Sequence, residues 1–382
     1  MARTMARVIR TTVPELPLVD LRGAAREVGR AHGEALREPI ARNLELYFRR
    51  FALEGGVERD EACRRGAAYL TVIDRTAPDY GEMVRGIAEA SRRPLNEIAA
   101  LNARYEILYS EFMRSILALA DAPPGDGCTA FAALPETTPD GHLRMGENWD
   151  WIPAVEGAIT RIDRGDGLRV LCFTEAGIAG GKIGLNSAGL GLAINGLVSD
   201  LDSWERLRTP FHVRTWRVLN SRSIDEALPA LLSEERSCSA NFLIGHMAAD
   251  GAAGALDVET SPAHAAQIRV RGAFAHANHF FDPDRLGIVQ PLDERSSTYR
   301  RCDRMQALLD ERRGRLDDAT IASCLRDHDG FPQSVCAHPS PLWPEEEAYA
   351  TVLSAILDLT NRSLLAAPGN PCVTPYARYA LA

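Results

Sequence analysis

The hydrophobic periodicity of the chain changes once, at the cluster of Pro, Gly and Asp in LADAPPGDG, residues 119–127. Upstream of this cluster, apolar residues recur at helical spacing, as in GAAREVGRAHGEAL, and predict about four helices. Downstream, short apolar runs such as CTAFAAL and LRVLCFTEA, separated by Gly, Asp or Pro, predict strands. Because Pro and Gly do not continue a helix, the cluster predicts an irregular boundary between a mainly helical segment, 1–127, and a strand-rich segment, 128–382.

The downstream segment also contains helical patterns among its strands. We predict helices in residues 213–220, 224–235, 298–313, 318–328 and 346–359. Runs of strands that alternate with pairs of helices, without strict strand–helix–strand alternation, favour an α+β layered sheet over a doubly wound parallel sheet.

Composition narrows the classes of function that the chain can have. Its 382 residues are 46% hydrophobic and 25% charged, which is typical of a folded globular protein and not of a disordered one. No apolar stretch approaches the roughly 18 residues of a membrane span. A net charge of -9 disfavours nucleic acid as a partner. The first residues lack the apolar core of a signal peptide, so we expect a cytoplasmic protein without a membrane partner.

The chain contains one lysine, Lys182, which is therefore the one candidate for Schiff-base chemistry. Its context, GIAGGKIG, does not predict a phosphate-binding loop, because Ala176 stands in place of the first glycine and Ile183 in place of the Ser or Thr. The eight cysteines include no CxxC pair, so we expect free thiols in a reducing compartment.

Cys128 differs from the other cysteines in its neighbours, because it follows the Pro/Gly cluster directly and begins the first predicted strand. A thiol at this place can attack the preceding Gly127 carbonyl and convert the peptide bond into a thioester, which water then hydrolyses. Glycine tolerates the strained backbone that this attack needs. The product begins at Cys128, and its α-amine, with a reference pKa of about 7.7 to 8.0, can accept the proton of the thiol. A small buried thiol without reactivity is the alternative.

The stretch DGCTAFAALPETTPDGHLRMGENWDW, residues 126–151, resembles the autoprocessing junction of the acyl-coenzyme A:6-aminopenicillanic acid acyltransferase family, N-terminal-nucleophile hydrolases of the peptidase C45 type. VGRAHGE, GLNSAGLGLAIN, SANFLIGH, LRDHDGFPQSVC and the closing GNPC are similar to segments of that family in the same order. The resemblance implies a four-layer αββα fold and an inactive precursor. It also implies that cleavage between Gly127 and Cys128 leaves two associated chains, 1–127 and 128–382.

The resemblance also implies roles for two polar residues of the downstream segment. Asp150 would orient the new amine or bind a substrate ammonium, and Asn241 would donate a hydrogen bond to the oxyanion. Asn148 lies two residues before Asp150, on the same strand face, and we expect it to contact substrate. Asn195 in GLAINGL is a second candidate donor and substrate contact; the family has a further asparagine where this chain has Leu197. Hydrogen bonds to nearby backbone are the alternative for each of these residues.

Arginine and histidine residues supply further candidates. Arg295 and Arg300 are candidates for binding a substrate carboxylate, because a guanidinium pairs with it through two parallel hydrogen bonds. His276 and His279 are spaced as helical neighbours, but a strand that runs into a turn points them to opposite faces, so we expect no metal site there. We expect no cofactor.

These observations predict an amidohydrolase or N-acyltransferase that passes an acyl group from Cys128 to water or to an amine. The substrate is a small acyl amide or acyl-coenzyme A. An unprocessed enzyme in which His328 is the base for Cys128 is one alternative, and a catalytically silent binding protein on the same scaffold is another.

Overall fold

The computed structural model describes residues 15–110, 127–233, 235–292, 296–341, 344 and 348–381. Two β-sheets form its centre. The strands of the larger sheet are β1 (Leu18–Arg22), β4 (Gly157–Asp163), β5 (Arg169–Glu175), β6 (Ile183–Asn186), β7 (Leu190–Gly196), β8 (Ala240–Met247), β9 (Ala253–Thr260) and β10 (Ala265–Arg269), adjacent in that order. β1 pairs with β4 in parallel, and the other neighbours are antiparallel.

The smaller sheet has six described strands. In spatial order they are β11 (Ala273–His276), β2 (Thr129–Ala133), β3 (Arg144–Trp151), β12 (Ala350–Asp358), β13 (Ser363–Pro368) and β14 (Ala377–Ala380). β2 and β3 are buried along their whole length; β2, TAFAA, is nearly continuously apolar, whereas β3, RMGENWDW, buries four polar or charged side chains.

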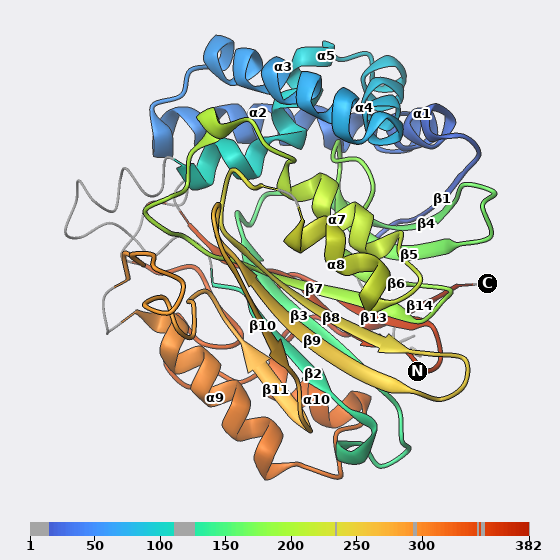
Figure 1. The fold of residues 1–382 in the computed structure, drawn as a ribbon, viewed down its shortest axis with the longest axis vertical. Helices are drawn as coiled ribbons and strands as arrows, with labels where there is room; N and C mark the ends of the chain where they lie inside the picture. The colour runs from blue at the N-terminus through green and yellow to red at the C-terminus, as the bar shows by residue number, and fades with distance from the viewer. Residues whose placement is uncertain are drawn as a thin grey trace, which may run out of the picture.

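The two sheets pack face to face, with helices on both outer sides (Figure 1). β2 and β3 contact β7 across the interface. The approach is close at Gly191 on β7, where an added Cβ would lie 3.0 Å from the Met145 sulfur on β3. α7 (Phe211–Leu219) and α8 (Ile224–Leu232) cover the larger sheet, and α9 (Ser297–Glu311) and α10 (Asp318–Leu325) cover the smaller one. The predicted α+β, four-layer αββα architecture is confirmed.

The upstream segment forms a group of helices at the top of Figure 1. They are α1 (Ala25–Ala35), α2 (Arg37–Gly55), α3 (Arg59–Thr76), α4 (Pro78–Ser91) and α5 (Leu95–Asn102), followed by helical residues 104–110. The segment, which was expected to be mainly helical, also contributes the strand β1 to the larger sheet. Among the described residues, no helix has both the length and the apolar composition to cross a membrane.

One predicted helix is a strand. Residues 350–358 of the predicted helix 346–359 form β12, between β3 and β13. This strand is buried on both faces, so its sequence ATVLSAILD is apolar almost throughout, and neither helical nor strand periodicity is expressed in it.

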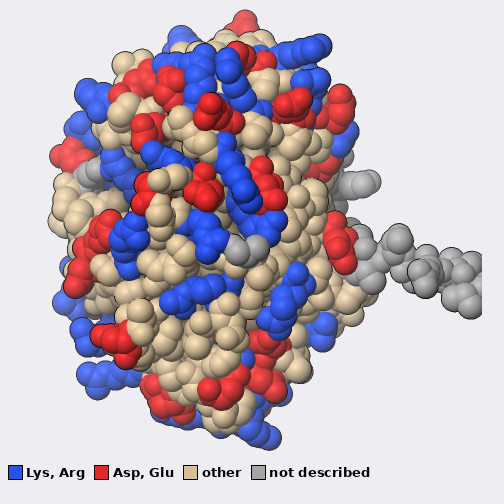
Figure 2. Space-filling model, turned by 90° about the vertical axis from the view of Figure 1, so that its right-hand side faces the viewer, with Lys and Arg blue, Asp and Glu red and all other residues tan. Residues whose placement is uncertain are grey.

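The face formed by α1, β1 and β4 carries both signs of charge. This face lies on the right of Figure 1, the side toward the viewer in Figure 2, where basic and acidic side chains are intermixed. Arg26 lies 3.0 Å from Glu82, and Arg161 lies 2.6 Å from Asp20. Exposed pairs like these contribute little to stability, but they neutralise the arginines locally.

Candidate active site

Cys128 lies directly before β2, at the end where β2 approaches the last residues of β3. Thr129 pairs with Asn148, so the same register brings Cys128 opposite Trp149 and Gly127 opposite Asp150, and the Cys128 sulfur lies 3.8 Å from the Asp150 carbonyl oxygen. Cys128 is 2% exposed and belongs to the apolar core between the two sheets, with Ala130 and Ala132. The thiol is therefore held in the inter-sheet layer, away from bulk solvent.

Arg301 on α9 binds the backbone on both sides of the Gly127–Cys128 peptide bond. One guanidinium nitrogen donates to the Gly127 carbonyl (2.5 Å), the Cys128 carbonyl (2.7 Å) and the Thr129 hydroxyl (3.0 Å). Arg301 is 2% exposed. A buried cation at this place favours negative charge on the Gly127 carbonyl oxygen.

Asp150 approaches the same peptide from β3. Its Oδ1 accepts a hydrogen bond from the Thr351 hydroxyl (2.6 Å). An added Cβ on Gly127 would lie 2.9 Å from Asp150 Oδ2, so the carboxylate directly faces the Gly127 backbone, and a side chain at residue 127 would collide with it. Both a guanidinium and a carboxylate thus lie close to Gly127 at the junction.

Asn148, two residues before Asp150 on β3, bonds to backbone away from the Gly127–Cys128 peptide. Its amide nitrogen donates to the Leu325 carbonyl (2.8 Å) at the end of α10 and to the Val335 carbonyl (2.7 Å). These two bonds use both amide hydrogens, so the structure places Asn148 as a brace between β3 and the loop after α10.

Asn195 and Asn241 face each other across β7 and β8. The Asn241 amide nitrogen donates to Asp257 Oδ1 (2.7 Å) and to Asn195 Oδ1 (3.3 Å), and the Asn195 amide nitrogen has no partner among the described residues. Asn278 links this pair to the junction: it accepts from Arg301 (3.0 Å) and donates to the carbonyl of Gly196, next to Asn195. The free donor of the pair belongs to Asn195.

A second polar cluster lies beside this pair, between Asp257 and Glu259 on β9 of the larger sheet and His276 on β11 of the smaller sheet. His276 Nε2 is 3.0 Å from Glu259 Oε1 and 3.8 Å from Asp257 Oδ2. Burial raises the pKa of Asp257 to about 6. His276 pairs with Ala130, two residues from Cys128, so the cluster is close to the thiol.

Charged side chains are also buried between the sheets and the N-terminal helices. Glu175 is paired with Arg104 and, at 2.5 Å, with Lys182, which lies 3.1 Å from the centre of the Trp149 ring. Glu147 accepts a hydrogen bond from the Ile194 amide (2.5 Å), and burial raises its pKa to about 8. Lys182 is thus engaged by a carboxylate and an aromatic face, which does not favour Schiff-base chemistry.

Two other predicted residues lie elsewhere, and a third is not described. Arg300 donates to the carbonyls of Gly330 (2.9 Å) and Gln333 (3.0 Å). His328 Nε2 lies 3.2 Å from His338 Nε2, in a separate cluster. Arg295 lies outside the described residues.

The sequence interpretation missed Arg301. On α9 the buried residues include Ser297, Arg301, Met305 and Leu308, at intervals of three and four, whereas Arg300 lies off this stripe. An arginine on an otherwise apolar helix face is the signal that could have identified it.

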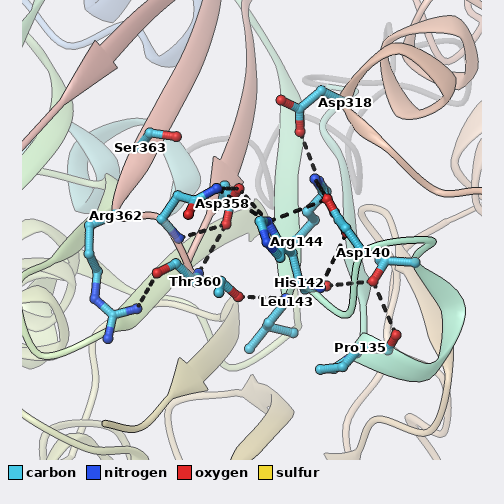
Figure 3. Close-up of polar contacts among 12 residues, drawn as sticks. Pro135, Asp140, His142, Leu143, Arg144, Asp318, Asp358, Thr360, Arg362 and Ser363 are labelled. Atoms are coloured by element: carbon cyan, nitrogen blue, oxygen red, sulfur yellow. Dashed lines mark hydrogen bonds and ion pairs between the residues drawn. The ribbon is translucent and has the colours of Figure 1, made fainter. Parts of the chain in front are cut away.

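The opposite end of β3 is held by a polar network (Figure 3). Arg144 is paired with Asp140 (2.7 Å) and Asp318 (2.8 Å), and His142 lies 2.9 Å from Asp358. The Arg144 guanidinium holds the pKa of Asp140 well below its usual range. These contacts join the β2–β3 connection to α10 and β12 and so fix the strand that carries Asp150.

The four-layer fold is of the N-terminal-nucleophile hydrolase type, and a cysteine stands at the start of an inner strand. Residues 137–371 match the model of the family described as "Acyl-coenzyme A:6-aminopenicillanic acid acyl-transferase", and the chain belongs to this family. The match includes Asp150, Asn241 and Arg301 and begins after Cys128. The expectation of an amidohydrolase or N-acyltransferase is confirmed at the level of the family.

The chain shares less than 30% sequence identity with each of three individual relatives. The chain is 29% identical over 324 residues to the 40 kDa form of the acyl-coenzyme A:6-aminopenicillanic-acid-acyltransferase of Emericella nidulans, covering 83% of this chain and 84% of that protein. An N-acylethanolamine-hydrolyzing acid amidase ortholog of Caenorhabditis elegans is 12% identical, with a TM-score of 0.43, over 67% of this chain and 100% of that chain. A variant of the conjugated bile acid hydrolase of Clostridium perfringens is 14% identical, with a TM-score of 0.42, over 67% and 97% of the two chains.

Proposed function

We propose that the chain is a precursor that cleaves itself between Gly127 and Cys128, and that the mature enzyme transfers or hydrolyses an acyl group through a Cys128 thioester. The observation that carries this proposal is the contact of Arg301 with the Gly127 and Cys128 carbonyls, with the Asp150 carboxylate also facing Gly127. This arrangement would be unusual for a peptide bond without a chemical role.

The cleavage step follows from the chemistry of these groups. The Cys128 sulfur, on losing its proton, bonds to the Gly127 carbonyl carbon, and Arg301 stabilises the negative charge that develops on the carbonyl oxygen. The bond from this carbon to the Cys128 nitrogen then breaks, and the nitrogen takes up the proton. Water hydrolyses the resulting thioester, which leaves a carboxylate on Gly127 and a free thiol and α-amine on Cys128.

The mature enzyme would use the same groups. The new α-amine accepts the thiol proton, and the nearby Asp150 carboxylate orients this amine by charge and hydrogen bonding. The sulfur attacks the acyl carbon of the substrate. Asn195 and Asn241 supply donors for the oxyanion, with the free Asn195 amide the more available of the two. The acyl group then passes from sulfur to water or to an amine.

A cavity beside the His276 cluster indicates which kind of substrate the enzyme would bind. It has a volume of about 690 Å³, lies between β10 and residues 281–287, and is lined by Glu259, Asp282, Asp284 and Arg285, among others. Glu259 connects it to His276. We propose that this cavity binds the part of the substrate other than its acyl group. Its acidic lining favours a cationic amine over the several negative charges of coenzyme A, so preferential turnover of acyl-coenzyme A by the mature enzyme would contradict this assignment.

The state of the cysteines indicates the cellular compartment of the protein. All eight cysteines are free thiols. We propose a reducing compartment, the cytoplasm, because free thiols persist there.

Mass spectrometry of the purified protein tests the cleavage. We expect fragments 1–127 and 128–382 from the native chain, an intact and inactive chain from Cys128→Ala, and native cleavage in the control Cys63→Ala on α3. A native chain that is active while intact would refute autoprocessing.

The two alternatives give different results. If His328 is the base for Cys128, the chain stays intact and His328→Gln abolishes turnover. If the protein is a silent binder, a small acylating amide leaves no acyl group on Cys128.

A further inference from the structure

Four metal-ligating side chains converge at a place that the proposed chemistry does not use. They are His328, Cys336, His338 and Cys372, and each pair of their ligand atoms lies within 4.8 Å. His328 follows α10, Cys336 and His338 lie in the loop between α10 and β12, and Cys372 follows β13. Segments that are distant in the sequence therefore bring two sulfurs and two imidazole nitrogens together.

The spacing of the four atoms fits a tetrahedral ion. His338 Nε2 lies 3.2 Å from His328 Nε2, 3.5 Å from the Cys372 sulfur and 3.7 Å from the Cys336 sulfur. With zinc–sulfur bonds of about 2.3 Å and zinc–nitrogen bonds of about 2.0 to 2.1 Å, neighbouring ligands of a tetrahedron lie roughly 3.3 to 3.8 Å apart. The observed distances need little adjustment to meet these values.

A side chain around the cluster supports the same interpretation. The Asn370 amide nitrogen lies 3.6 Å from the Cys336 sulfur, and it also donates to the Ala337 carbonyl (2.6 Å). Hydrogen bonds from nearby donors to ligating sulfurs are common around bound metal ions, because they stabilise the thiolate and fix its orientation.

We propose that His328, Cys336, His338 and Cys372 bind one Zn²⁺ ion. Two sulfur and two nitrogen ligands are the set that zinc prefers in structural sites, and four protein ligands leave no open position for a substrate. Binding converts both thiols to thiolates and releases their protons to solvent. The ion is structural, and it joins the loop after α10 to the segment after β13.

The site is connected to the candidate active site through Ala337, which lies between two of the ligands. The Ala337 amide donates to the Thr351 hydroxyl (3.0 Å), and the Thr351 amide donates to the Ala337 carbonyl (3.0 Å). The same Thr351 hydroxyl donates to Asp150 Oδ1 (2.6 Å). Zinc binding would thereby fix the peptide that positions Asp150.

Elemental analysis of the full-length protein, prepared without a metal-affinity tag, tests the proposal. We expect one zinc per chain in the native protein, none in the double variant Cys336→Ser/Cys372→Ser, and one in the control double variant Cys63→Ser/His246→Asn. After replacement by Co²⁺, the native protein should show the intense visible absorption of a tetrahedral site and sulfur-to-cobalt charge transfer.

A measurement on the native chain alone keeps the test decisive if the double variant does not fold. Mercurial modification of the thiols should release one zinc per chain, as detected with a chromophoric chelator. The proposal is wrong if native protein saturated with Zn²⁺ and desalted retains none. It is also wrong if peptide mapping finds a Cys336–Cys372 disulfide in the native protein, or if the double variant retains a full equivalent of zinc.

Discussion

Arg301 and Arg300 are adjacent in sequence but lie in different environments. Arg301 is buried against the Gly127 and Cys128 carbonyls, whereas Arg300 holds the exposed loop at Gly330 and Gln333. This pair allows a matched comparison. We expect Arg301→Gln to slow cleavage of the precursor by about 10² to 10³, the effect of removing one oxyanion donor, and Arg300→Gln to leave the rate unchanged.

The time course of fragment formation on a denaturing gel measures both rates. Equal rates for the Arg301 variant and the native chain, with both folded, would exclude Arg301 from the cleavage step.

The two asparagines across β7 and β8 act as one unit, because the Asn241 amide holds the Asn195 oxygen and so sets which way the Asn195 amide hydrogens point. We expect Asn195→Ala and Asn241→Ala each to lower kcat by about 10² to 10³. The double variant should lose little more than either single variant, because coupled residues are not additive. Steady-state kinetics on one acyl amide measure this, and multiplied losses would show that the two residues act independently.

Glu147 gives a prediction about pH. Burial raises its pKa in the folded chain to about 8, with Asp150 acting in the same direction and Lys182 against it. A raised carboxyl pKa stabilises the fold below the unfolded value of about 4.3, and this contribution is lost as pH rises through about 8. The side chain of Glu147→Gln cannot ionise, so the free energy of unfolding of this variant, relative to that of the native chain, should increase by roughly 3 to 4 kcal/mol between pH 5 and pH 8.

Urea denaturation at both pH values measures this difference. The control variant Glu205→Gln, at an exposed residue, should show no such difference. A pH-independent difference for Glu147→Gln would contradict the raised pKa.

At the scale of elements, β3 carries two residues with different roles, Asn148 and Asp150, which lie two positions apart along the strand. Asn148 braces the strand to Leu325 and Val335, and Asp150 faces Gly127 where β12 has an irregularity between Thr351 and Leu353. Loss of the Asn148 amide would leave two buried carbonyls without a donor. We expect Asn148→Ala to lower the free energy of unfolding by about 2 kcal/mol or more.

Urea denaturation of the precursor checks this, with Asn220→Ala at the end of α7 as the control. An unchanged stability together with a raised KM would restore Asn148 as a substrate contact.

The elements also show which parts of the structure could be predicted from the sequence. The junction at Cys128, the helices α9 and α10 and the layered α+β class follow from local patterns and from a family resemblance. The contact of Arg301 with Gly127 does not, because it joins residues far apart in the chain and depends on which face of α9 is buried. The strand β12 was missed for a related reason, since a sequence apolar on both faces loses the periodicity that distinguishes strand from helix. The convergence of His328 and Cys372 is likewise a product of tertiary packing.

At the scale of the whole molecule, the upstream segment is built into the sandwich. β1 pairs with β4, the Asn43 amide donates to the Ala176 carbonyl (3.0 Å), and the Tyr47 hydroxyl accepts from the Trp151 indole (2.7 Å). Arg104 is paired with the buried Glu175. After cleavage, separation of the two fragments would expose these groups and break a sheet edge.

We therefore expect fragments 1–127 and 128–382 to elute together in size-exclusion chromatography and to separate only under denaturing conditions. Elution of the larger fragment alone, in folded form, would show that the helical segment is dispensable after processing.

The burial of Lys182 has a practical consequence for chemical labelling. The other basic residues of the chain are arginines, and this lysine is 1% exposed and paired with Glu175. Amine-reactive dyes and cross-linkers therefore find no lysine side chain on the folded surface and can react only with α-amines. Each cleavage event creates one new α-amine, at Cys128, so after denaturation, which also exposes Lys182, each processed chain would bind one dye molecule more than an intact chain.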